Sequence, residues 1–114
     1  MVELEQNGYY PLTEESLDLA VPSRPGIYML AIRLANGVQQ TIFTSQSENL
    51  YLSLRKLAIG DWEHLPPDVF TCLGRYRCYF TYFVILRQEY REEVQKLLTH
   101  TSDPVVRLTV VNSN

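Results

Sequence analysis

An Asn-Gly pair, Asn36-Gly37, separates two runs of residues that favour β-strands. The run before it, Gly26 to Leu34, reads GIYMLAIRL, and the run after it, Val38 to Thr44, reads VQQTIFT. Both are rich in β-branched and large apolar side chains. Asn and Gly tolerate the positive φ angles of a type I′ turn, which joins two strands through a two-residue loop. The pattern therefore predicts a β-hairpin from Gly26 to Thr44.

The residues that follow the hairpin have the pattern of a capped helix. Ser45 and Glu48 match a capping box, in which the Ser hydroxyl accepts a first-turn N–H and the carboxylate reaches back. Leu residues repeat at helical spacing over 50–57, and Gly60 provides a stop. The sequence predicts a helix that begins near Gln46 with Ser45 as its N-cap.

The C-terminal half predicts a third strand and a second helix. Pro66-Pro67 argue against a regular helix through 60–74. Aromatic and β-branched residues over 75–86 are typical of a strand, and its apolar end, 83–86, is expected to be covered on both faces. In the segment 88–98, a helical stripe is formed by Tyr90, Val94, Leu97 and Leu98.

These elements have the order β-β-α-β-α, and Val105 to Val111 suggests an extra C-terminal strand. We expect an α+β fold in which helices flank a small antiparallel three-stranded sheet. Residues 1–24 are interpreted as an acidic N-terminal lead-in, with one short helix capped by Thr13, and residues 25–114 as a single domain.

Charge and cysteine usage limit the classes of partner. The net charge is −3. The segment 1–18 contains five acidic residues and no Lys or Arg, so the rest of the chain is only slightly basic. Tight nucleic-acid binding is not expected, because phosphate contacts by Lys and Arg supply most of that affinity. Cys72 and Cys78 have no metal-ligand spacing to either His and are expected to be free thiols. No segment has the length of a membrane span, so we expect a cytoplasmic protein without a membrane partner.

The stretch Pro25-Gly26-Ile27-Tyr28 and the residues after it resemble the GIY-YIG nuclease domain. That family begins with a Gly-Ile/Val-Tyr strand, turns through a hairpin and ends its second strand in Tyr-Ile/Val-Gly. Its polar link with an Asn-Leu pair is similar to Gln46 to Leu50 here. The resemblance covers about two-thirds of the chain, Pro25 to Leu98.

The resemblance also implies which positions carry the family's chemistry. The family cuts phosphodiester bonds with one divalent metal ion, two Tyr, an Arg on the first helix and a metal-binding Glu on the second. The equivalent positions here are Tyr28, Phe43, Ser53 and Gln95. A gap of two or three residues would replace Gln95 by Glu92 or Glu93. Arg55 does not replace the missing Arg, because two helical residues turn a side chain by about 200°.

Three of the four positions lack the group that the chemistry needs. Phe43 has no hydroxyl, Ser53 has no charge for a developing phosphorane, and Gln95 is a poor ligand for a hard cation. Our first hypothesis is therefore a non-catalytic interaction module without a cofactor, which binds an unknown protein or, less favourably, nucleic acid. The alternative is a divergent endonuclease that cleaves DNA with Mg²⁺ or Mn²⁺, with Lys56 and Glu92 as substitutes.

Candidate binding residues lie in two groups. Ser45, Gln46 and Ser47 stand at the predicted helix N-terminus, where backbone N–H groups can hold a phosphate or where the side chains simply cap the helix. Lys56 is one turn beyond Ser53. The second group is Arg75 and Arg77, which alternate on one face of the predicted third strand and either contact a polyanion or remain solvated.

Overall fold

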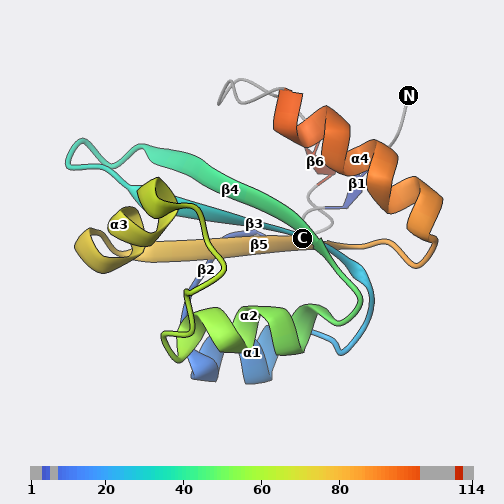
Figure 1. Ribbon diagram of the computed structural model, residues 1–114, viewed down its shortest axis with the longest axis horizontal. Coiled ribbons are helices and arrows are strands. Elements are labelled where there is room, and N and C mark those ends of the chain that lie inside the picture. The colour runs from blue at the N-terminus through green and yellow to red at the C-terminus, as the bar shows by residue number, and fades with distance from the viewer. Residues whose placement is uncertain (1–3, 6–7, 101–109, 112–114) are drawn as a thin grey trace.

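One antiparallel sheet with helices on both of its faces forms the body of the protein (Figure 1). The computed structural model describes residues 4–5, 8–100 and 110–111. The elements are β1 (Leu4–Glu5), β2 (Tyr10–Pro11), α1 (Glu14–Ala20), β3 (Gly26–Arg33), β4 (Gln39–Ser47), α2 (Leu50–Ala58), α3 (Pro67–Arg75), β5 (Cys78–Val84), α4 (Gln88–His100) and β6 (Val110–Val111). The predicted α+β class is confirmed.

The main sheet has four strands in the order β2-β5-β3-β4, and every neighbouring pair is antiparallel. The prediction of three strands is wrong by one, because Tyr10–Pro11 pairs with Phe80 and Tyr79 of β5. A two-residue strand has no periodic pattern of its own, so only its partner defines it. Of the predicted C-terminal strand, 105–109 lie outside the described residues, while Val110–Val111 pairs in parallel with β1.

The predicted hairpin is confirmed, but its turn differs from the prediction. β3 pairs with β4 from Gly26 opposite Ser47 to Arg33 opposite Gln39. In the loop, the Gly37 N–H donates to the Leu34 carbonyl at 2.9 Å, and Gly37 has a φ of 84°. No other type of residue has a positive φ in the described part of the chain, so a type I′ turn is excluded. The connection is a three-residue loop with Gly in its left-handed position.

The helix after the hairpin begins later than predicted. Ser45 lies inside β4, opposite Tyr28, so the predicted N-cap and capping box are wrong. Asn49 caps α2 instead, since its side-chain oxygen accepts the Leu52 N–H at 3.1 Å. Pairing with β3 keeps the backbone extended through Ser47, and this long-range contact moves the helix start along the chain.

Helix α3 contradicts the prediction that the two prolines exclude a regular helix from this segment. Pro67 occupies the first turn of α3, where an N–H has no intrahelical partner and the fixed φ of proline suits a helix. The helix buries Val69 and Leu73 and ends at Arg75. Arg75 and Arg77 therefore do not alternate on a strand face, since β5 begins only at Cys78.

The predicted third strand and last helix are present with different buried faces. Val84 and Leu86 are 41% and 60% exposed, so the end of β5 is not covered on both faces. Val94 and Leu98 of α4 are buried as expected, whereas Tyr90 and Leu97 are 37% and 53% exposed. The residue that completes the buried stripe of α4 is Arg91.

Two apolar clusters lie on the two faces of the sheet. The larger one joins β3 and β5 to α1, α2 and α3 and includes Tyr28, Leu30 and Leu54. The smaller one joins the opposite face to α4 and includes Ile27 and Met29. Successive strand residues point to opposite faces, so β3 is buried on both sides and its unbroken apolar run is explained.

The N-terminal residues 10–20 contribute to the same core as the rest of the sheet. Leu17 of α1 is fully buried in the larger cluster. The Tyr82 hydroxyl donates to the Ala20 carbonyl at 2.5 Å, and the Tyr51 hydroxyl donates to Asp18 at 2.5 Å.

None of the helices in the described ranges is long and apolar enough to cross a membrane.

Candidate functional site

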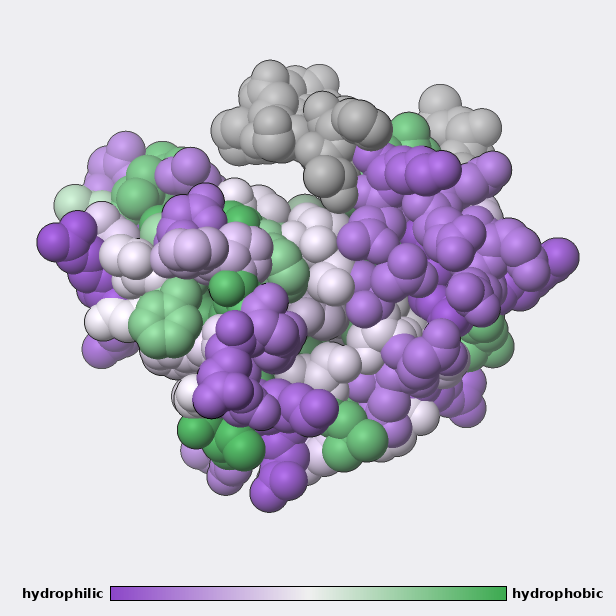
Figure 2. Space-filling view, in the orientation of Figure 1, coloured by the Kyte–Doolittle hydropathy of each residue, from purple (hydrophilic) through white to green (hydrophobic). Residues whose placement is uncertain are grey.

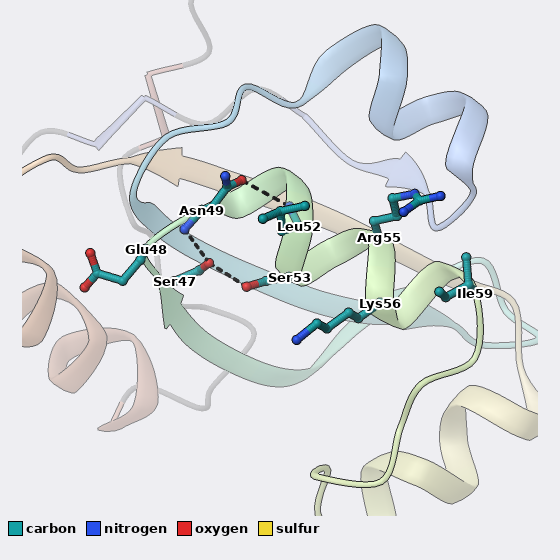
Figure 3. Close-up of a pocket in the computed structure, with 8 residues that line it drawn as sticks. All are labelled: Ser47, Glu48, Asn49, Leu52, Ser53, Arg55, Lys56 and Ile59. Atoms are coloured by element: carbon teal, nitrogen blue, oxygen red, sulfur yellow. Dashed lines mark hydrogen bonds between the residues drawn. The ribbon is translucent and has the colours of Figure 1, made fainter.

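A network of short polar side chains joins the end of β4 to the first turns of α2 (Figure 3). The hydroxyl oxygens of Ser47 and Ser53 are 2.5 Å apart, and Ser47 also accepts the Asn49 N–H at 3.0 Å. Asn49 in turn caps the helix through Leu52. The hydroxyl of Ser53 is therefore hydrogen-bonded within the junction itself.

Tyr28 lies beneath this junction as a core residue. It is 4% exposed, and its ring centroid is 6.2 Å from that of Phe43 on the neighbouring strand. Burial raises the pKa of the Tyr28 hydroxyl above its ordinary value, and a hydrogen bond with Ser45 partly offsets this. The hydroxyl is therefore protonated at neutral pH and is a poor proton acceptor, although it can donate a hydrogen bond.

Gln95, the fourth position of the resemblance, lies on a helix that packs on the opposite face of the sheet from Tyr28. Gln95 is half-buried on α4, whose buried neighbours Val94 and Leu98 belong to the smaller cluster. The Tyr28 ring belongs to the larger cluster, so Tyr28 and α4 lie on opposite faces of the sheet. Glu92 and Glu93, the alternatives to Gln95, are exposed on α4.

An ion pair joins α4 to Glu48, just before α2. Arg91 donates to the Glu48 carboxylate at 3.0 Å, with the Arg91 side chain 3% and the Glu48 side chain 81% exposed. Figure 3 shows Glu48 pointing away from Ser53 and Lys56. The Glu48 carboxylate is thereby directed at α4 and not at the Tyr28 side of the sheet.

A pocket of about 330 Å³ opens along α2, and we call it the α2 pocket. It is lined by Ser47, Glu48, Asn49, Leu52, Ser53, Arg55, Lys56 and Ile59. Figure 3 shows the Lys56 side chain extending on the same side of α2 as Ser53, whereas Arg55 extends from another side. Arg55 thus lines the pocket without replacing Ser53 at its position.

No protein-family model, curated protein or solved structure matches the chain. The site is therefore defined by its own geometry. Ser47, Ser53 and Lys56 are the predicted residues that the structure brings together in the α2 pocket.

The other predicted binding residues lie elsewhere. Ser45 contacts Tyr28, and Gln46 is opposite Ile27, on the α4 face of the sheet. Arg75 ends α3, and Arg77 lies in the link before β5. These residues do not line the α2 pocket.

Sequence reasoning missed the apolar residues of the pocket. Leu52 and Ile59 are 53% and 56% exposed and are seven residues apart, which places them on one face of α2. The sequence could have indicated this exposed apolar pair, because Leu52 and Ile59 fall outside the Leu50-Leu54-Leu57 stripe that is buried. The α2 pocket therefore combines two apolar side chains with two cationic ones, beside the polar residues of the β4–α2 junction.

Cysteine thiols and metal ligands are two further kinds of group that could carry chemistry. Cys72 and Cys78 are free, as predicted, and burial raises the pKa of the Cys78 thiol to about 11. A thiol with that pKa is a weak nucleophile at neutral pH. Within the described ranges, no group of three or more His, Cys, Asp or Glu side chains is arranged to hold a metal ion.

Proposed function

We propose that the chain is a non-catalytic interaction module with a GIY-YIG-like fold, which binds a protein partner through the α2 pocket. The observation that carries the proposal is the state of the Arg position of the resemblance. Ser53 stands there, and its hydroxyl is held by Ser47 at 2.5 Å. Serine carries no charge to offer a substrate, and the Ser53 hydroxyl is already engaged in closing the β4–α2 junction.

The residues around the α2 pocket favour a particular kind of partner. Leu52 and Ile59 offer apolar contact, while Arg55 and Lys56 offer positive charge. The one lining carboxylate, Glu48, is already paired with Arg91. The pocket is therefore complementary to a protein segment that presents apolar and acidic side chains together.

The hydropathy of the molecular surface favours a partner contact that is limited to the region of α2. Figure 2 shows the outer surface of α4 as mainly hydrophilic, while hydrophobic residues lie among hydrophilic ones over the region of α1 and α2. Nucleic acid is a less favourable partner, because the net charge of −3 leaves few phosphate-neutralising contacts.

The first test of the proposal is a cleavage assay. The purified protein, incubated with Mg²⁺ or Mn²⁺ and labelled duplex, single-stranded and branched substrates, is expected to show no phosphodiester cleavage. Loss of one electrostatic transition-state contact commonly lowers a rate by about 10² to 10³. Phe43, Ser53 and Gln95 together represent three such losses, which need not multiply but leave a rate below detection.

The opposite result would favour the divergent endonuclease. Metal-dependent cleavage that Tyr28→Phe abolishes would overturn the proposal, and its loss in Lys56→Met and Glu92→Gln would identify the substitute groups. A cleavage signal that all three variants retain indicates a contaminating nuclease and leaves the expected result in place.

The second test measures binding to the pocket. The probe is a fluorescein-labelled amphipathic helical peptide with Leu on one face and Glu at the borders of that face, so that both kinds of side chain can reach the pocket. We expect saturable binding by fluorescence anisotropy, and we expect Lys56→Glu to raise the Kd at least about fivefold, because it places like charges across the contact.

Lys96→Glu is the matched control, since Lys96 is exposed on α4 and outside the pocket. It makes the same charge change and is expected to alter the Kd less than twofold by long-range effects alone. Equal weakening in both variants would remove the α2 pocket from the proposal.

A further inference from the structure

Strand β4 forms one edge of the main sheet. It is nine residues long, and in the described part of the chain it is paired with β3 alone. An edge strand presents a row of backbone N–H and carbonyl groups that another strand can pair with. A long edge strand is therefore either protected against pairing or used to pair with another strand.

Charged residues and proline, two devices that often protect an edge strand, are missing from β4. Its sequence, QQTIFTSQS, contains no charged residue and no proline. One irregularity is present, where the pairing with β3 passes from Phe43 opposite Leu30 to Thr41 opposite Ala31 and leaves Ile42 as an extra residue. From Phe43 to Ser47 the register is regular, so this part keeps the geometry of a strand that can accept a neighbour.

The opposite edge of the sheet is different. It is formed by β2, which has two residues, of which the exposed Pro11 lacks a backbone N–H. Such an edge is too short and too poor in donors to add a strand. A second copy of the sheet can therefore be joined through β4 but not through β2.

We propose that two copies of this chain pair through β4, antiparallel, to form one continuous eight-stranded sheet. Because β2 is blocked, the contact uses the same edge on both copies and closes after two. Extension into a fibre, which would need two different free edges, is thereby avoided.

Charge favours a second copy as the occupant. The whole chain has a net charge of −3, but β4 itself has no charged residue. Antiparallel pairing of two β4 strands therefore brings no like charges of β4 together, whatever the register. The residue that follows β4 is Glu48, and its carboxylate is paired with Arg91. The uncharged edge offers nothing that would select a charged peptide over its own copy. The inference does not depend on the α2 pocket.

The test is sedimentation equilibrium of the full chain at about 5 to 500 μM, a range in which weak protein dimers dissociate. We expect a monomer–dimer equilibrium. The double variant Thr41→Lys, Gln46→Lys places one charge near each end of β4, so antiparallel pairing brings Lys side chains of the two copies together. We expect the dimer Kd to rise at least about tenfold.

The matched control is Thr71→Lys, Gln88→Lys, which makes the same substitutions at exposed positions of α3 and α4. The control is expected to leave the dimer Kd within about twofold, as for remote surface charges. Equal weakening in both double variants would overturn the proposal, as would a monomer over the whole range.

Hydrogen exchange of the unmodified protein gives an independent readout if the edge variant does not fold. Amides of β4 are expected to exchange more slowly as concentration rises. A dimer with unchanged exchange in β4 would place the interface elsewhere and overturn the proposal. Slow exchange at every concentration would mean that the chain itself covers the edge, with the same consequence.

Discussion

Gly26→Ala is expected to lower the free energy of unfolding by at least about 4 kcal/mol, which would leave little folded protein. A Cβ at position 26 would lie 2.1 Å from the Phe83 carbonyl oxygen and 2.8 Å from a Leu50 methyl carbon. The carbonyl belongs to β5, which is paired with β3 at this point, so it cannot move away without opening the sheet. Gly26 is thus required for close approach of two backbones.

Urea unfolding followed by circular dichroism measures this effect. Gly74→Ala is the matched control, because Gly74 lies in α3 and an added Cβ there meets no atom within 4 Å. Since Ala favours a helix over Gly, this control is expected to be neutral or stabilising by up to about 1 kcal/mol. A Gly26→Ala protein within 1 kcal/mol of the unmodified one would contradict the close packing of β3 against β5.

Arg91→Met is expected to lower the free energy of unfolding by about 3 kcal/mol, the scale of lost hydrogen bonds from a charged donor. One guanidinium nitrogen of Arg91 donates to the carbonyls of Ile85 and Leu86 at 3.1 and 3.0 Å, and the other donates to Glu48. Met retains much of the buried volume but has no donor. The link between β5 and α4 would then keep two carbonyls without their partner.

Glu48→Gln separates the ion pair from the carbonyl contacts. The Glu48 side chain is 81% exposed, so the pair is largely solvated on that side, and the variant is expected to cost no more than about 1 kcal/mol. The same urea titration compares the two variants. A Glu48→Gln loss as large as that of Arg91→Met would show that the ion pair, and not the carbonyl contacts, holds α4 in place.

The buried Arg91 illustrates why a helical pattern identifies a helix better than its buried face. The apolar stripe of residues 88–98 correctly indicated α4, but it assigned Tyr90 and Leu97 to the core. The Ile85 and Leu86 carbonyls, in the link after β5, accept hydrogen bonds from Arg91 and so favour a donor at position 91. That requirement belongs to the packed structure and leaves no periodic signal in the sequence.

In the candidate site, too, some features follow from the sequence pattern and others depend on the packed structure. The predicted hairpin places Tyr28 and Phe43 on neighbouring strands, and the structure confirms that their rings lie close together. The role of Ser53 could not be predicted, because its partner Ser47 was expected inside a helix and lies at the end of a strand. The α2 pocket depends on that same shift of the helix start.

By itself, the sequence determined the local elements whose patterns are strong: the Gly26 to Thr44 hairpin, the Leu50-Leu54-Leu57 face of α2 and the existence of α4. Each of these depends on contacts between residues near one another in the chain. Only the tertiary structure decided the pairing of β2 with β5, the cap at Asn49 and the position of β4 at one end of the strand order. The physical reason is that strand pairing satisfies backbone groups at long range, and it overrides local capping and turn preferences wherever the two compete.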